Sequence, residues 1–319
     1  MQGIDVELFT FDFDLTWAAF LMNRHGHVYA RYGCRKDEHA EGLLSLKGLA
    51  RVLRKALEAH SADADRKPAA WTPRLAESAR STPDVLKTGR QCMHCHQVFD
   101  YQRRDRGAAF DKLEATRAYP LPENVGVTLD HDLASVVKQS TGVAAKAGVK
   151  AGDEIVALNG TPVWSAADMS HILHEAKEKD ALRLEIVRAG AKQEVTLAPD
   201  GDWKRRDISW RGSMWPLRPH PGFGGPRLKA DELARLGVTF GFRIQYLVDW
   251  GEDRATGEHA KKAGFRKGDV VVSCAGKSDF ASELEFQAWF RLTRKEGEEL
   301  EFGIVRDGKP LTLKLKVLP

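Results

Sequence analysis

The sequence has few cysteines, little charge bias and no long apolar run. Four cysteines in 319 residues are too few for a disulfide-stabilised scaffold. The 49 basic and 45 acidic side chains leave a formal charge of +4 and are spread along the chain, so no clustered basic surface for nucleic acid is predicted. No apolar run approaches the roughly 18 residues that span a bilayer. We expect a globular chain of two or three domains with neither a nucleic-acid partner nor a transmembrane segment.

The segment Cys92–His96, CMHCH, is the most informative pattern in the chain. Two thiols three positions apart with a histidine directly after the second are typical of covalent haem attachment in c-type cytochromes. Cys92 and Cys95 would form thioether bonds to the porphyrin, and His96 would be an axial ligand of the iron. Candidates for the second axial ligand are Met214, His131 and His220. The expected cofactor is therefore covalently bound haem c.

The same cluster leaves two other interpretations open. Cys92 and Cys95, together with one or both of His94 and His96, form a possible zinc or copper site, although a second ligand pair at the usual spacing is missing. A thiol pair without any ligand is the third interpretation.

The chain has no recognisable export signal at its start. Met1–Asp14 contains no basic first residues, no apolar stretch and no small-residue cleavage site. Haem attachment to a Cys-x-x-Cys-His motif takes place outside the cytoplasm. We therefore expect a protein of the periplasm or cell envelope whose signal peptide was removed or lost by N-terminal truncation.

The N-terminal region predicts a hairpin followed by a helix. An apolar run ending at Met22 and the segment Val28–Tyr32 flank a polar turn, as in a β-hairpin. Ser45 then precedes leucines at helical spacing, so a helix over 45–60 should pack one face on the hairpin. Over residues 4–60 this arrangement resembles the C-terminal half of a thioredoxin fold.

The thioredoxin resemblance implies that a part of the fold is missing. A complete thioredoxin fold begins with a further β-α-β segment that carries its own Cys-x-x-Cys, so we expect the chain to be truncated at its N-terminus. Cys92 and Cys95 follow the closing helix and therefore cannot be the redox pair of that fold. A truncated thiol-disulfide oxidoreductase is accordingly one alternative function.

A repeat dominates the second half of the chain. AAKAGVKAGDEIVALNG at 144–160 recurs as AKKAGFRKGDVVVSCAG at 260–276. A helix-start box follows in each copy, at Ser165–Asp168 and Ser282–Glu285, and a strand hairpin closes each unit. These residues resemble the PDZ domains of bacterial envelope proteins. The chain should contain two such β-rich domains.

The PDZ resemblance implies where a partner binds. In that family an extended peptide C-terminus adds as a strand between one β-strand and a helix. The strand residues of the two grooves would be Val125, Gly126 and Val127 in the first copy, and Gly237, Val238 and Thr239 in the second. The expected partners are protein C-termini or extended peptides. Alternatively, one or both grooves are filled internally and the units serve as spacers.

Together these patterns predict an α+β multidomain chain. Residues 1–60 form a partial thioredoxin-like α/β region, 61–120 a linker with a short helical haem-motif segment, and 121–200 the first PDZ domain. A linker with three tryptophans, 201–229, leads to the second PDZ domain at 230–319. We expect this linker to pack across a neighbouring domain.

The predicted function combines redox or electron-transfer chemistry at haem with peptide docking at the PDZ grooves, and the redox partner is not specified. No Gly-x-Ser-x-Gly sequence occurs, and no separate catalytic domain remains beside the PDZ units. We therefore expect a binding protein rather than an enzyme. The main alternative is a non-redox PDZ peptide-binding scaffold that holds zinc or copper at the Cys/His cluster.

Overall fold

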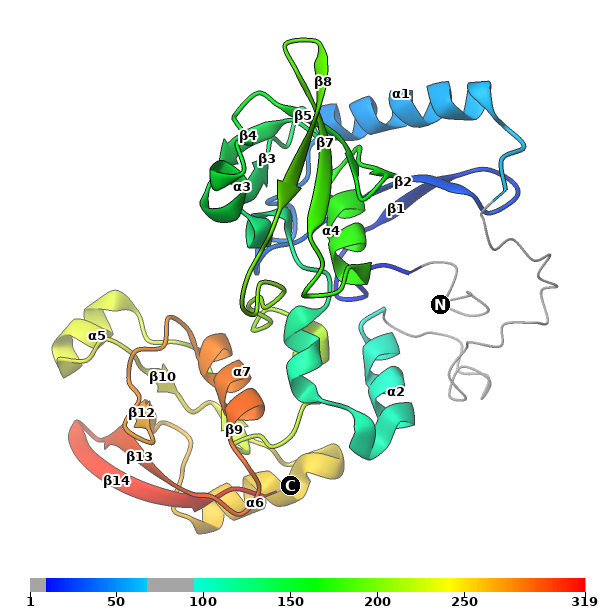
Figure 1. Cartoon of the computed structure of the whole chain (residues 1–319). Coiled ribbons are helices and arrows are strands. Elements are labelled where there is room, and N and C mark those ends of the chain that lie inside the picture. The colour runs from blue at the N-terminus through cyan, green and yellow to red at the C-terminus, as the bar shows by residue number, and fades with distance from the viewer. Residues whose placement is uncertain (1–9, 68–94, 319) are drawn as a thin grey trace. The chain divides into compact units, whose positions relative to one another are not determined.

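The computed structural model describes residues 10–67 and 95–318 and divides the chain into two compact units, Met1–Asp207 and Ile208–Pro319. Figure 1 shows the elements of both units. Cys92, Met93 and His94 lie outside the described residues. Among the helices that are described, none is long and apolar enough to cross a membrane.

The first unit begins with the hairpin and helix that the sequence predicts. Strands β1 (Ala19–Met22) and β2 (Val28–Tyr32) pair in antiparallel fashion. Helix α1 (Leu46–Ala62) begins after Ser45, whose side chain accepts a hydrogen bond from the Gly48 amide. In Figure 1 this helix lies along the hairpin, and the two share one small apolar cluster.

After the gap the first unit continues through short helical segments into a β-rich part. These elements are α2 (Gln97–Arg106), the 3-10 turns η2 (Gly107–Ala109), η3 (Lys112–Arg117) and η4 (Pro122–Val125), β3 (Val127–Leu129), β4 (Val137–Ser140), α3 (Gly142–Lys146), β5 (Glu154–Leu158), β6 (Thr161–Pro162), α4 (Ala166–Glu175), β7 (Leu182–Arg188) and β8 (Ala191–Leu197). The four-stranded sheet has the order β6-β5-β7-β8, and β3 pairs with β4.

A single apolar core holds this β-rich part together. Alternate residues of β7, Leu182, Leu184 and Ile186, are fully buried, as the two-residue period of a half-buried strand requires. Trp203, from the predicted linker, packs into the same core, so that segment is not solvated at this point. The buried Asp153 receives two hydrogen bonds from Arg188 at 2.7 Å, which pairs its charge.

The second unit repeats most of this arrangement. Its elements are η5 (Gly212–Met214), β9 (Phe223–Gly224), α5 (Ala230–Leu236), β10 (Phe242–Arg243), β11 (Tyr246–Leu247), η6 (Gly251–Asp253), α6 (Arg254–Lys262), β12 (Val270–Cys274), α7 (Glu283–Thr293), β13 (Glu299–Arg306) and β14 (Lys309–Lys316). The four-stranded sheet has the order β10-β12-β13-β14, and β9 pairs with β11. The edge strand β10 of this sheet precedes β12 in the chain, whereas β6 follows β5 in the first unit. Turn η5 and helix α5 have no counterpart in the β-rich part of the first unit.

The repeat extends to individual hydrogen bonds. The pair Asp153–Arg188 recurs as Asp269–Arg306, again at 2.7 Å. The side chain of Ser165 accepts from the Asp168 amide, and that of Ser282 accepts from the Glu285 amide, so both helices begin with the same cap. Helices α4 and α7 therefore occupy equivalent places.

Candidate functional site

The first candidate site is the groove between strand β3 and helix α4. Gly126 precedes β3 with a φ of 79°, and a Cβ there would lie 2.1 Å from the Thr141 carbonyl oxygen. The Thr141 amide donates to the Gly126 carbonyl at 2.8 Å, which directs that carbonyl toward β4. Because backbone groups alternate in direction along a strand, those of Val127 point away from β4. The open edge of β3 is therefore formed around Val127.

Two adjacent faces of helix α4 are in contact with other parts of the unit. Met169, Ile172 and Leu173 pack into the core of the unit. Ala167, Ser170 and His171 share the neighbouring face and line a cavity of about 20 Å³ together with residues between Phe11 and Cys34. The cavity wall opposite α4 thus comes from the N-terminal part of the chain. In Figure 1 the β1–β2 hairpin lies beside α4.

Two titratable side chains of α4 are strongly affected by this packing. Burial raises the pKa of Asp168 to about 6, although hydrogen bonds from the backbone amides of Arg31 and Trp164 act in the opposite direction. Burial lowers the pKa of His171 to about 3, with further lowering by the charge of Arg31. At neutral pH the groove therefore presents a neutral imidazole.

Basic side chains lie near Glu123 in the turn before β3. Burial raises the pKa of Glu123, while Lys36 and Arg206 lower it. Arg206 donates to the carbonyl oxygens of Tyr119 and Arg35, each at 2.7 Å, and lies 3.6 Å from the carboxylate of Asp12. One guanidinium therefore connects the N-terminal part of the chain to the segment that leads into the groove.

The second groove lies at a different strand from the one expected. Gly237 ends α5 with a φ of 64°, and Val238 packs against the cluster of Leu228 and Leu233. The strand equivalent to β3 is β9, since the Val248 amide donates to the Gly222 carbonyl at 2.8 Å as Thr141 does to Gly126. Gly237, Val238 and Thr239 thus belong to the insertion between β9 and β10. The overlooked signal is PGFGG at 221–225.

The open edge of β9 is bound by the second unit's own helix. The side-chain amide of Gln287 donates to the Phe223 carbonyl at 3.0 Å and to the Glu283 carboxylate at 2.8 Å. Ser170 stands at the position of α4 that corresponds to Gln287, five residues after the capping serine in each case (165 to 170 and 282 to 287). Its shorter side chain makes the two grooves chemically different.

Basic side chains surround the turn before β9. His220 Nδ1 accepts from the Gly222 amide at 3.1 Å, and burial lowers the pKa of His220 to about 4. Burial also lowers the pKa of Arg291 to about 10. Pro221 has no N–H to offer. Because the Gly222 amide is also engaged, this turn has fewer amides for an incoming carboxylate than its length suggests.

An aromatic side chain packs on the groove helix in the same way in both units. Tyr119 stacks on His174 with ring centroids 4.2 Å apart, and Arg291 lies 5.0 Å from the ring centroid of Trp215. Each aromatic residue stands seven positions before the glycine of the turn (119 to 126 and 215 to 222). Both aromatic contacts fix the segment that leads into the groove strand.

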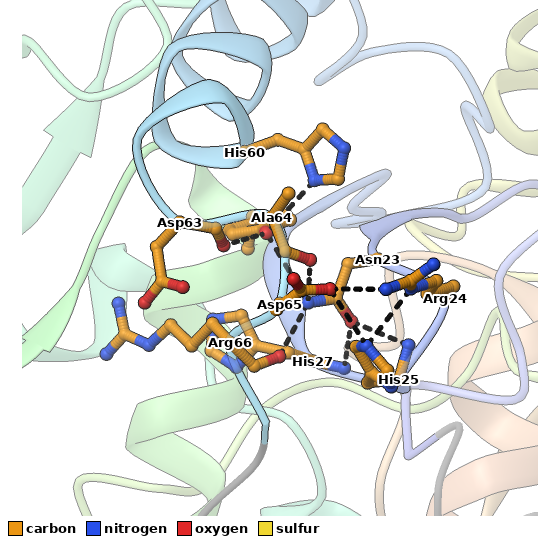
Figure 2. A network of polar contacts seen from close by, with 10 residues as sticks. Asn23, Arg24, His25, His27, His60, Asp63, Ala64, Asp65 and Arg66 are labelled. Carbon is orange, nitrogen blue, oxygen red and sulfur yellow. Dashed lines mark hydrogen bonds and ion pairs between the residues drawn. The ribbon is translucent and has the colours of Figure 1, made fainter.

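A polar network fixes the hairpin to the end of α1. Figure 2 shows the Asn23 carboxamide accepting hydrogen bonds from the amides of His25 and His27 at 2.9 and 3.0 Å. The same side chain donates to the Arg66 carbonyl at 2.6 Å, and Arg24 pairs with Asp65. The histidines here serve the backbone turn and ion pairs. Hairpin and helix are thereby joined as one body.

The cysteine and histidine cluster has a structural role where it is described. Cys95 packs with Phe11, Phe13, Val98 and Phe99, and His96 stands at the N-terminus of α2. Within residues 10–67 and 95–318 no group of three or more His, Cys, Asp or Glu side chains is placed to hold a metal ion.

The three candidates for the second axial ligand are divided between the two units. Met214 is completely buried in the second unit, where His220 bonds to backbone, and His131 is exposed in the β3–β4 turn of the first unit.

Comparison with known proteins identifies a domain in the first unit. Residues 122–198 match the family model described as PDZ domain. This range begins at turn η4 and ends after β8, so it contains the β3–α4 groove. The PDZ part of the predicted fold is thereby confirmed for the first copy, whereas the thioredoxin-like region lies outside the match.

Several curated relatives are named as proteases. A probable periplasmic serine endoprotease DegP-like of Pseudomonas putida (strain GB-1) is 35% identical over 159 residues, covering 47% of this chain and 31% of the relative. The DegP-like protein of Pseudomonas savastanoi pv. phaseolicola is 29% identical over 203 residues, with coverages of 62% and 40%. Regulator of sigma-E protease RseP of Escherichia coli (strain K12) is 29% identical over 179 residues, with coverages of 54% and 33%. The chain spans a third to two fifths of these relatives' lengths.

Among solved structures, the HtrA-type protease AlgW with decapeptide aligns at a TM-score of 0.25 and 17% identity, covering 43% of this chain and 44% of that one. The same protease with tripeptide gives a TM-score of 0.26 at 14% identity, with coverages of 44% and 53%.

The relatives correct the functional predictions. Proteins named as periplasmic serine endoproteases contradict haem c, zinc or copper as cofactors and contradict electron transfer as the function. They equally leave no support for a metal-holding scaffold or a truncated thiol-disulfide oxidoreductase. The expectation of a binding protein rather than an enzyme is also contradicted. It rested on the missing Gly-x-Ser-x-Gly sequence and on the lack of a separate catalytic domain, whereas the related chains are named as proteases.

Proposed function

We propose that this chain acts in proteolysis in the bacterial periplasm and that its first unit docks the extended end of a protein substrate in the β3–α4 groove. The observation that carries the proposal is that the PDZ match, residues 122–198, contains a strand edge at Val127 beside a helix. The periplasmic process is supported by the names of the relatives.

The groove has the chemistry of a strand-addition site. A peptide strand beside β3 would pair with the backbone of Val127, and main-chain hydrogen bonds supply affinity in this binding mode. Ala167 and Ser170 are small, so the helix side leaves room for a peptide side chain. His171 is neutral at pH 7 because its pKa is lowered to about 3. We expect a preference for apolar or neutral side chains over acidic ones.

The first groove is the better candidate of the two. In the second unit Gln287 already binds the Phe223 carbonyl. A peptide strand there would have to displace this buried hydrogen bond, which is worth about 1 kcal/mol in net value. In the first unit Ser170 stands in the position of Gln287. Its shorter side chain leaves the backbone groups at the edge of β3 for a ligand.

Binding of fluorescent decapeptides to the full chain tests this proposal. Peptides with a free carboxyl end should raise the anisotropy in a saturable way, and amidated peptides of the same sequence should bind at least about tenfold more weakly. Ala167→Trp, which fills the groove, should abolish binding. Glu175→Trp adds the same indole at an exposed position of α4 and should leave binding unchanged. Equal binding by both variants would show that the peptide lies elsewhere.

A further inference from the structure

Residues Phe11–Arg35, called the cover below, lie over the face of α4 that a docked peptide would contact. Ser170 on that face is 4% exposed. It lines a cavity with Phe11, Phe20 and Tyr32 of the cover. A groove helix in an open PDZ unit would present this face to solvent. The burial of Ser170 therefore comes from the chain's own N-terminal region.

A short segment of the cover reaches into the groove. Tyr32, Gly33 and Cys34 line a second cavity whose other walls include Pro122 and Leu129, together with the first turn of α4. Its volume is about 30 Å³, enough for one or two water molecules and too small for a peptide side chain. Burial raises the pKa of Cys34 to about 12, as expected for a thiol removed from water.

Two clamps hold the cover on either side of this segment. At one end the Arg31 amide donates to Asp168 Oδ1 at 2.6 Å, and Ser165 Oγ donates to the Arg31 carbonyl at 2.5 Å. At the other end Arg206 donates to the Arg35 carbonyl at 2.7 Å. Both clamps bind backbone groups of the cover. They therefore fix where the cover lies without depending on the side chains of Arg31 and Arg35.

The cover closes the groove, but it does not occupy the place of a peptide strand at the edge of β3. In the part of the chain that the structure describes, β3 is paired with β4 alone, so the cover adds no ladder to the edge at Val127. An edge without a strand partner is the usual place for β-augmentation. A peptide that pairs with β3 would gain main-chain hydrogen bonds that the cover does not make. The cover is therefore displaceable by a ligand of this kind.

The cover is joined to helix α1. The network around Asn23 links the hairpin turn to the end of α1 (Figure 2), and Tyr29 contacts His60 at 3.1 Å. Gly33 has a φ of 118°, and a Cβ there would lie 2.5 Å from the Trp17 carbonyl oxygen, so the cover folds tightly on itself at this residue.

Helix α1 also binds the β-rich part, through ion pairs of Arg51 and Lys55 with Glu154. Departure of the hairpin and α1 as one body therefore breaks these ion pairs as well as the two clamps.

We propose that the cover is an autoinhibitory element of the first groove: extended peptide ends dock only after residues Phe11–Arg35 have left α4. This inference rests on the proposed docking function of the same groove. It predicts that a fraction of molecules is open at any moment and that the apparent affinity is reduced by that fraction. Any change that loosens the cover without altering the groove should then tighten peptide binding.

Gly33→Ala loosens the cover, because a Cβ at this φ collides with the Trp17 carbonyl oxygen. Gly42→Ala is the matched control, since a Cβ there would meet its nearest atom at 3.4 Å without a positive φ. Measured by anisotropy on the full chain with the same carboxyl-ended decapeptides, Gly33→Ala should bind at least about tenfold more tightly than wild type. Gly42→Ala should bind as wild type does.

Hydrogen exchange gives a second measurement that does not depend on a variant. Saturating wild type with peptide should speed exchange of the Arg31 amide, because its bond to Asp168 is broken when the cover leaves. Equal affinity of wild type and Gly33→Ala, with an Arg31 amide that peptide leaves protected, would overturn the cover while the docking function stands. Absence of binding to both proteins would overturn the docking function itself.

Discussion

The backbone amide of Arg31 donates a hydrogen bond to the Asp168 carboxylate across 2.6 Å, although the two residues are 137 positions apart in the chain. The bond joins strand β2 to the first turn of α4. Asp168 is 4% exposed and also accepts from the Trp164 amide at 3.1 Å. A buried carboxylate with several donors is stable only while all of them stay in place. The N-terminal hairpin is thereby tied to the groove helix.

Replacement of Asp168 by alanine should destabilise the first unit. The change leaves the Arg31 and Trp164 amides without their acceptor, and each unsatisfied buried group costs about 1–3 kcal/mol. We expect a loss of about 2–4 kcal/mol in urea unfolding followed by circular dichroism. Asp180→Ala, at an exposed position, is the control and should change the stability by less than about 0.5 kcal/mol. A negligible effect of Asp168→Ala would mean that the clamp is not formed in solution.

His171 should make the first unit less stable in acid. Its pKa is lowered to about 3 from the ordinary value of 6.5, so the unfolded chain takes up a proton that the folded chain refuses as the pH falls between these values. Asp168, with a pKa raised to about 6, acts in the opposite direction, so the effect must be measured as a difference. His171→Gln should gain stability relative to wild type by at most about 1.4 kcal/mol per pH unit below pH 6.5.

The measurement is urea unfolding of both proteins at intervals from pH 7 to pH 4. Gln193→Ala, an exposed change without a titratable group, should run parallel to wild type over the whole range. A difference between His171→Gln and wild type that does not grow on acidification would show that His171 is solvated.

The two turn glycines should tolerate no side chain. A Cβ on Gly126 would lie 2.1 Å from the Thr141 carbonyl oxygen, and one on Gly222 would lie 2.5 Å from that of Thr256. Both have a positive φ, so alanine brings strain as well as a collision. Gly152→Ala is the control, because its φ of 89° adds strain but no atom lies within 4 Å. Both turn variants should unfold at clearly lower temperatures than Gly152→Ala, and equal melting temperatures of all three variants would contradict the close packing of the two turn glycines.

Gln287 should stabilise the second unit, because its carboxamide bonds to the Phe223 carbonyl, the Glu283 carboxylate and the Arg291 guanidinium. Gln287→Met keeps the volume but leaves the Phe223 carbonyl, now bound at 3.0 Å, without its donor. The expected loss is about 1–3 kcal/mol in urea unfolding. Gln193→Met in the exposed strand β8 should cost less than about 0.5 kcal/mol. If Gln287→Met were as stable as wild type, the edge of β9 would be open to a ligand.

Most of the fold could be predicted from local sequence patterns. Ser45, Ser165 and Ser282 each precede a helix that the structure contains, because a capping side chain acts within one turn. The repeat at 144–160 and 260–276 could be recognised because its two copies align residue by residue within one short segment. The strand β9 could not be found, since it has two residues in a segment rich in proline, glycine and tryptophan, and its pairing with β11 is a long-range contact.

The candidate site was predictable only in part. The resemblance assigns Val125, Gly126 and Val127 to a groove strand. Val127 remains the proposed docking residue, whereas Val125 ends turn η4 and Gly126 precedes β3. The packing of Tyr32–Cys34 against α4 depends on bonds between Arg31 and residues more than a hundred positions away, which no local pattern reveals. The CMHCH motif led to a wrong cofactor prediction, because the spacing of cysteine and histidine gives no information on the residues that surround them in the fold. The protease relatives contradict the haem interpretation.

The most direct measurement of the central claim is amide hydrogen exchange of the full chain with and without a saturating carboxyl-ended decapeptide. Docking in the first groove predicts that exchange slows at Val127 in β3, because a peptide strand would engage the edge that faces away from β4. Unchanged exchange at Val127, with slower exchange at β9 or elsewhere, would contradict the account.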